Sequence, residues 1–128
     1  MKQTLSEDFI REFKDRVAWI WISAHQRFSE NFIEDFQDRI HWAWLCISQD
    51  LSEHLMKQFS DKIDWEAVPQ YQTLSEDFIR EFQYKMVWRK ISLQQRLSEN
   101  FLNEFKDKIE WYTVTEDPIP ERNSNVEI

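Results

Sequence analysis

The sequence predicts an all-α protein, a short right-handed solenoid built from five repeats of 23 residues. Three observations predict this fold. A form of Leu5-Ser6-Glu7 recurs every 23 residues, apolar side chains recur in the same phase, and the 128 residues include no glycine. Glycine supplies the positive φ of tight hairpin turns, so its absence argues against a β-meander. We therefore expect the chain to turn through short helical segments.

The repeats follow one another without insertion, and we number the positions of each repeat from its opening Leu or Phe. They begin at Leu5, Phe28, Leu51, Leu74 and Leu97. A unit of this size cannot bury its apolar face alone, so neighbouring units must stack. We expect one solenoid domain over residues 1–117 and a polar tail or cap over residues 118–128.

The first half of each repeat has the pattern of a helix. In the first repeat Ser6 is a favoured N-cap, and Glu7 suits the positive end of the helix dipole. Positions five, six, nine and thirteen are apolar and fall on one helical face, as Ile10 and Phe13 do. This pattern predicts a helix of about ten to eleven residues.

The second half of each repeat contains a Trp at position fifteen and a Gln at position twenty-two in the first four repeats. Ser23–Gln26 and Ser92–Gln95 match a capping box, which predicts a short α or 3₁₀ turn over positions nineteen to twenty-two. Pro69 excludes an unbroken helix there in the third repeat. We expect the Gln side chains to form a buried hydrogen-bonded series. The competing interpretation is a strand over positions thirteen to eighteen, as in a leucine-rich horseshoe.

The repeat pattern Leu-Ser-Glu-x-Phe-Ile-x-Glu-Phe-x-Asp-x-Ile-x-Trp resembles the short tandem repeats of proteins from giant DNA viruses and some phages. Residues 74–82, which read LSEDFIREF, nearly match the opening of that repeat. The layout is also similar to leucine-rich repeat variant proteins, which alternate α- and 3₁₀-helices in a superhelix. The resemblance implies the repeat fold and a viral or phage protein acting in the host cytoplasm, and it implies no chemistry.

Composition argues against several function classes. The chain has 16 Lys and Arg against 24 Asp and Glu, a net charge of −8, which disfavours direct nucleic-acid binding. No apolar run is long enough to cross a membrane. Without glycine there is no phosphate-binding loop. Cys46 is the only cysteine and is expected to be a small buried residue, and no His or Cys has metal-ligand spacing. We therefore expect a protein that is not an enzyme, with no cofactor, metal site or catalytic residue.

The repeat framework is regular, but a few positions vary strongly from one repeat to the next. Trp21 and Trp44 occupy one such position, where they either form an exposed binding surface or extend the core. Our first hypothesis is a non-catalytic protein that binds another protein, and the resemblance suggests an inhibitor of a host defence factor. The candidate partner-binding residues are Ile20, Trp21, His41, Trp44, Tyr84, Val87, Arg89 and Lys90.

Two alternatives come from other features of the repeats. Carboxylates at position eight could imitate phosphates, so that the chain blocks the DNA- or RNA-binding groove of a restriction or CRISPR nuclease, although a basic row lies beside them. The acidic candidates are Glu12, Asp35, Glu81 and Glu104. The second alternative is a structural or self-assembling protein, because identical units can stack between chains whose ends are uncapped. We expect a monomer or weak self-association.

Overall fold

The computed structural model describes residues 4–111, and these residues form nine α-helices, one 3₁₀-helix and no strand. The all-helical repeat fold is thus confirmed, and the alternative strand over positions thirteen to eighteen is wrong in the described residues. The expected tail at 118–128 lies outside them. The chain divides into two compact units, Met1–Gln72 with three repeats and Thr73–Ile128 with the other two, and each is treated separately.

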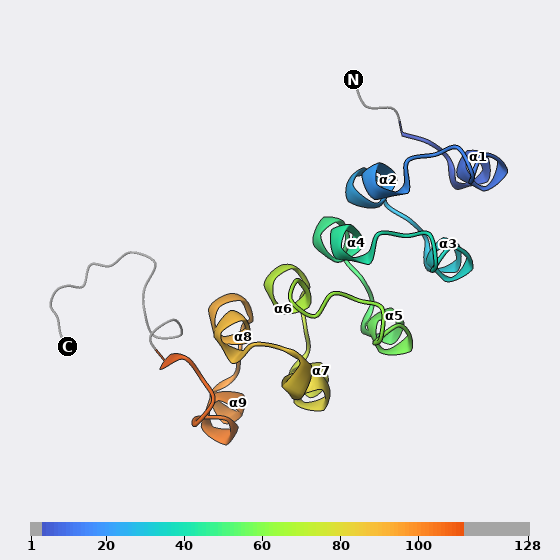
Figure 1. Ribbon diagram of the computed structural model, residues 1–128. Helices are drawn as coiled ribbons and strands as arrows, with labels where there is room; N and C mark the ends of the chain where they lie inside the picture. Colours follow the sequence, from blue (N-terminus) through green and yellow to red (C-terminus); the bar gives the residue numbers. More distant parts are fainter. Residues whose placement is uncertain (1–3, 112–128) are drawn as a thin grey trace, which may run out of the picture. The chain divides into compact units, whose positions relative to one another are not determined.

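Each of the first four repeats contributes a first and a second helix, and the described part of the fifth repeat contributes a first helix. The first helices are α1 (Glu7–Glu12), α3 (Glu30–Asp35), α5 (Glu53–Gln58), α7 (Glu76–Phe82) and α9 (Glu99–Glu104). The second helices are α2 (Trp19–His25), α4 (Trp42–Ser48), α6 (Val68–Tyr71) and α8 (Trp88–Gln94). Within the first unit the first helices form one row and the second helices another (Figure 1).

The first helices begin where the sequence predicts and end earlier. The Ser6 hydroxyl accepts a hydrogen bond from the Phe9 amide at 3.1 Å, and the other four repeats make the same N-cap. The α-helical part is only six or seven residues long because Phe13, with φ −110° and ψ 31°, leaves the helix. The backbone then tightens into a turn in which the Arg16 amide donates to the Phe13 carbonyl at 2.8 Å.

In the first, second and fourth repeats the second helix begins at position fifteen, so the predicted start at position nineteen is wrong there, whereas α6 of the third repeat begins at position eighteen. The Trp19 indole N–H donates to the Lys14 carbonyl at 2.9 Å and holds the chain at the helix start. Ser23 is not a cap but a buried residue inside α2, and its hydroxyl accepts from the His41 amide of the next repeat at 3.0 Å. In the third repeat the helix is only the four residues of α6, because Pro69 must lie in its first turn.

Buried glutamines at position twenty-two close the repeats, as predicted. Gln49 accepts a hydrogen bond from the Phe28 amide at 2.8 Å and donates to the Phe28 carbonyl at 3.0 Å. Gln72 accepts from the Leu51 amide at 2.8 Å and donates to the Gln49 carbonyl, also at 2.8 Å. Each glutamine thus binds the first residue of its own repeat, and Gln72 also binds the repeat before it.

The apolar core lies between successive repeats as well as within them. Trp19 packs on Phe32 and Phe36 of the next repeat, with ring centroids 6.1 and 5.2 Å apart. Trp88 packs on Phe101 and Phe105 in the same way, at 6.2 and 5.1 Å. The position-fifteen Trp residues of the first four repeats are half-buried, and Trp111 is exposed.

Removing the position-twenty-two amide should destabilise the fold. We expect Gln49→Ala to lower the free energy of unfolding by about 2–4 kcal/mol, because the buried N–H and C=O groups of Phe28 lose their partner. Urea denaturation followed by circular dichroism measures the change. Gln58→Ala is the matched control, since the Gln58 side chain is exposed and donates to the exposed Glu34, and it should cost under about 0.5 kcal/mol. Equal losses in the two variants would contradict this assignment.

Candidate functional site

An exposed apolar surface lies on two neighbouring helices of the first unit. α2 and α4 pack side by side. Ile20 of α2 is 60% exposed, and Trp44 of α4 is 43% exposed. Trp21 and Ile47 are also exposed. These four residues, Ile20, Trp21, Trp44 and Ile47, are called the α2/α4 surface below, and they place both variable tryptophans in solvent rather than in a deeper core.

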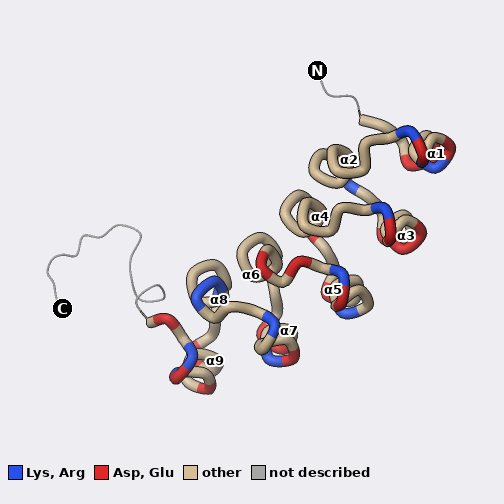
Figure 2. Tube along the Cα trace, viewed as in Figure 1, with Lys and Arg blue, Asp and Glu red and all other residues tan. Residues whose placement is uncertain are grey.

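The α2/α4 surface belongs to helices that carry no Lys, Arg, Asp or Glu. The sequences of α2 and α4 are WIWISAH and WAWLCIS, and both helices are free of charge colouring in Figure 2. The charged residues of this unit lie mainly on α1, α3, α5 and the turns that follow them. The imidazole of His25 packs against the Trp21 ring, with centroids 4.4 Å apart. An uncharged patch of this kind is typical of a protein-binding surface.

His41 lies beside this surface but has a structural role. It is the N-cap of α4, and its Nδ1 accepts from the Trp44 amide at 3.4 Å. Its own amide donates to the Ser23 hydroxyl of the preceding repeat. Because its ring and its amide are both engaged in holding α4, His41 positions Trp44 rather than presenting a free imidazole.

The other four candidates lie in the second unit. Tyr84, in the 3₁₀-helix η1 (Gln83–Lys85), is 85% exposed, and Lys108 Nζ lies 5.1 Å from the centre of its ring. Val87 is the N-cap of α8 and is exposed. The remaining two, Arg89 and Lys90, are in the first turn of α8, where Arg89 is exposed and Lys90 is half-buried. The structure thus groups Ile20, Trp21, His41 and Trp44 in the first unit, whereas Tyr84, Val87, Arg89 and Lys90 belong to the second.

The four acidic candidates are all exposed, and ion pairs neutralise two of them. Arg11 pairs with Asp35 of the next repeat at 2.7 Å. Arg80 pairs with Glu104 of the next repeat at 2.8 Å, and this hydrogen bond raises the pKa of Arg80. At both junctions the arginine at position seven neutralises the carboxylate at position eight of the next repeat. This pairing reduces the negative potential that a phosphate mimic needs. Glu12 and Glu81 are the other two candidates.

Cys46 is fully buried inside α4 and has the place that Ser23 and Ser92 occupy in their own repeats. Its sulfur accepts from the Asp64 amide at 3.5 Å, as the Ser92 hydroxyl accepts from the Glu110 amide at 3.0 Å. Burial raises the pKa of Cys46 to about 11. The prediction of a small buried residue is confirmed, and the thiol is held in its neutral form.

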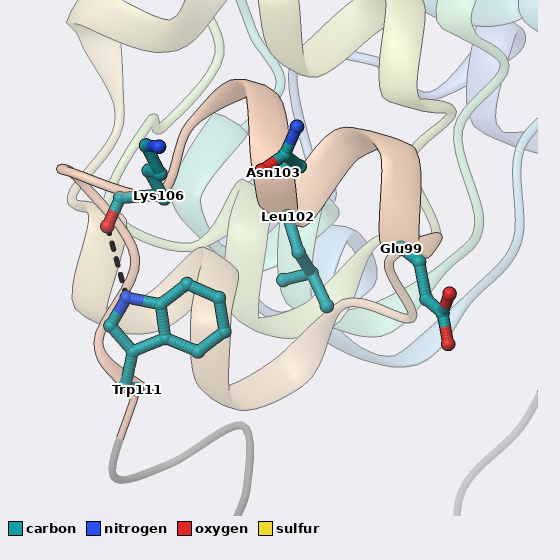
Figure 3. Close-up of a pocket in the computed structure, with 5 residues that line it drawn as sticks. All are labelled: Glu99, Leu102, Asn103, Lys106 and Trp111. Atoms are coloured by element: carbon teal, nitrogen blue, oxygen red, sulfur yellow. Dashed lines mark hydrogen bonds between the residues drawn. The ribbon is translucent and has the colours of Figure 1, made fainter.

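A hollow of about 370 Å³ lies at the last described repeat, lined by Glu99, Leu102, Asn103, Lys106 and Trp111. Figure 3 shows the Trp111 indole beside Leu102, with its N–H directed to the Lys106 carbonyl at 2.9 Å. Over residues 4–111 no three His, Cys, Asp or Glu side chains are grouped to hold a metal ion. The same stretch contains no helix with the length and apolarity that crossing a bilayer requires.

Ile47 of the α2/α4 surface was not predicted from the sequence; like Leu93 in the fourth repeat, it occupies position twenty and is exposed. Position twenty reads Ala24, Ile47, Gln70 and Leu93 in the first four repeats, so it varies as strongly as the positions that were chosen. The expected capping box assigned this position to a separate turn. Once the second helix begins at position fifteen, position twenty lies one turn after position seventeen on the same face.

Comparison of the chain with protein-family models, with curated proteins and with solved structures finds no match.

Cys46 should resist alkylation in the folded protein. With a pKa of about 11, only about one thiol in a thousand is ionised at pH 8. We expect iodoacetamide to react on the order of a hundredfold more slowly with the native chain than with the urea-unfolded chain, as followed by mass spectrometry. The native rate should rise as the pH approaches 11. Similar rates in the two states would show that the thiol is accessible.

Proposed function

We propose that the protein is a non-catalytic repeat protein that binds another protein through its α2/α4 surface. The supporting observation is the exposure of two tryptophans and two isoleucines on adjoining, uncharged helices. Tryptophan contributes strongly to binding hot spots because it buries a large rigid surface at a small cost in side-chain entropy. The partner is expected to present an apolar face of low charge.

The geometry of α2 and α4 supports recognition of an elongated apolar element. Trp21 and Trp44 occupy position seventeen of successive repeats. Because α2 and α4 pack side by side, the two residues are about one helix spacing apart, or about 8–10 Å. Both lie on helices fixed by buried residues, Ile22 in α2 and Leu45 in α4. Rigid helices hold the two rings in place before binding, which reduces the entropy lost on association.

The resemblance of the repeat to those of giant DNA viruses and phages extends the proposal to the class of partner. A protein of this kind, acting in a host cytoplasm, would bind and block a host factor such as a defence enzyme. The acidic mimic of a nucleic acid is the second candidate. The ion pairs of Asp35 and Glu104 with neighbouring arginines favour the apolar surface over it.

Substitution of both exposed tryptophans should abolish partner binding. We expect the double variant Trp21→Ala and Trp44→Ala to lose at least about tenfold in affinity, because each ring supplies buried apolar area at the interface. Pull-down from host lysate, followed by quantification of the protein that the unmodified chain captures, measures the effect. Leu93→Ala, which removes an exposed apolar side chain from α8, should leave capture unchanged.

Salt dependence separates the two candidate functions. Binding through the uncharged α2/α4 surface should change less than about threefold between low and physiological salt, because few charges are neutralised. A nucleic-acid mimic should instead lose affinity steeply with salt and be displaced by DNA or RNA. Full capture by the double tryptophan variant together with steep salt dependence would replace the first proposal with the second.

A further inference from the structure

The two ends of the repeat array expose the two halves of one junction. At position five, Phe32, Leu55 and Phe101 are almost fully buried because the preceding repeat covers them. Phe9 of the first repeat occupies the same position and is 44% exposed. The side of the first repeat that carries Phe9 and Phe13, called the head face below, thus matches a surface that later repeats bury.

The last described repeat exposes the complementary half. At position six, Ile10, Ile33 and Ile79 are completely buried. Leu102 has that position in the last described repeat and is only half-buried. Trp111 at position fifteen is 43% exposed. Leu102 and Trp111 line the hollow of Figure 3, together with Glu99 and Asn103. This side of the repeat is called the tail face.

The aromatic contacts inside the protein show what the tail face accepts. At three described junctions a position-fifteen Trp packs on a Phe of the next repeat, and Trp42 with Phe59 at 5.2 Å is typical. The corresponding pair across two chains is Trp111 of one copy with Phe9 and Phe13 of a second. Those two Phe rings are already packed together, with centroids 4.7 Å apart, as Phe32 and Phe36 are at 4.6 Å.

The polar contacts of the junctions also have matching groups at the two ends. The Glu7 carboxylate accepts from the Ser29 amide and hydroxyl at 2.7 and 2.8 Å, and Glu76 accepts likewise from Ser98. Across two chains the same positions are Glu99 on the tail face and Ser6 on the head face.

Charge complementarity continues through two further positions. Arg39 pairs with Asp15 of the preceding repeat at 2.7 Å, and Lys62 pairs with Asp38 at 3.2 Å. The end residues at these positions are Arg16 on the head face and Asp107 on the tail face.

Positions seven and eight also provide a hydrogen-bond donor on one end face and an acceptor on the other. The Gln58 amide donates to Glu34 at 2.9 Å inside the protein. At the ends, Asn103 at position seven of the tail face can donate to Glu12 at position eight of the head face, so that the donor and acceptor positions are exchanged. Each of the polar pairs at the ends therefore joins a donor to an acceptor.

We propose that the tail face binds the head face of a second copy of this chain, so that the protein associates head to tail in continuation of its own repeats. The contact joins two different surfaces, so it leaves a head and a tail free and can extend to longer assemblies. This inference uses residues outside the α2/α4 surface and does not depend on the proposed function.

Association of the full chain tests the proposal. Light scattering after size exclusion should give a mass that rises above the 15.9 kDa of one chain as concentration increases toward about 1 mM. We expect Phe9→Glu to weaken association at least about tenfold, because it puts a charge where the Trp111 ring would pack. The variant should still fold, since a Glu three residues after Ser6 completes a capping box.

Ile20→Glu is the matched control, because it places the same charge on an exposed apolar residue of α2 that is not among the residues assigned to the head face or the tail face. It should associate like the unmodified chain. A strictly monomeric unmodified chain would overturn the proposal, as would undiminished association of Phe9→Glu. Association that Ile20→Glu abolishes to the same extent would place the contact on the α2/α4 surface instead.

A charge exchange gives an independent test of the register. Arg16→Asp and Asp107→Arg each place like charges at the proposed contact, and the ion pairs described above between repeats involve neither residue. Each variant alone should associate more weakly than the unmodified chain. An equimolar mixture restores opposite charges at every contact and should regain association. A mixture no better than its components would contradict this register.

Discussion

A 23-residue unit has too little chain to enclose its own apolar side chains, and the rest of the structure follows from this constraint. Each repeat leaves a Trp on one side and two apolar side chains, at positions five and nine, on the other, and burial comes from packing one repeat against the next. Trp19 on Phe32 and Phe36 is the clearest example. Cohesion therefore depends on neighbours, and Phe9 in the first repeat and Leu102 in the last described repeat are more exposed than the residues at the same positions of the other repeats.

Polar contacts set the register of this packing. Buried glutamines hydrogen-bond the first residue of a repeat near its end, as Gln49 does with Phe28. Ser23 and Cys46 accept hydrogen bonds from backbone amides of the following repeat. Surface ion pairs such as Arg39 with Asp15 add little energy in water, but they discriminate between correct and shifted stacking. Because buried and junction residues set the register, the outward positions of α2 and α4 can differ between repeats without disturbing the stacking.

Much of the fold was predictable from the repeat itself, because a helix cap and an apolar period are local features. The serine caps and the closing glutamines were found in this way. The start of the second helix was not, since Ser23 is compatible with a cap until the His41 amide of the next repeat is known to bind it. The exposure of Trp21 and Trp44 also required the structure, because a variable position can lie in a core or on a surface.

The described helices end without any residue at positive φ. First helices end in a Phe near φ −110° in four repeats, and second helices end in an extended Gln, such as Gln49 at φ −144° and ψ 154°. Glycine is therefore not needed at these turns. The benefit appears in the unfolded state, where a chain without glycine samples fewer backbone conformations and loses less entropy on folding. For a protein made of very short helices, a restricted unfolded ensemble is itself a source of stability.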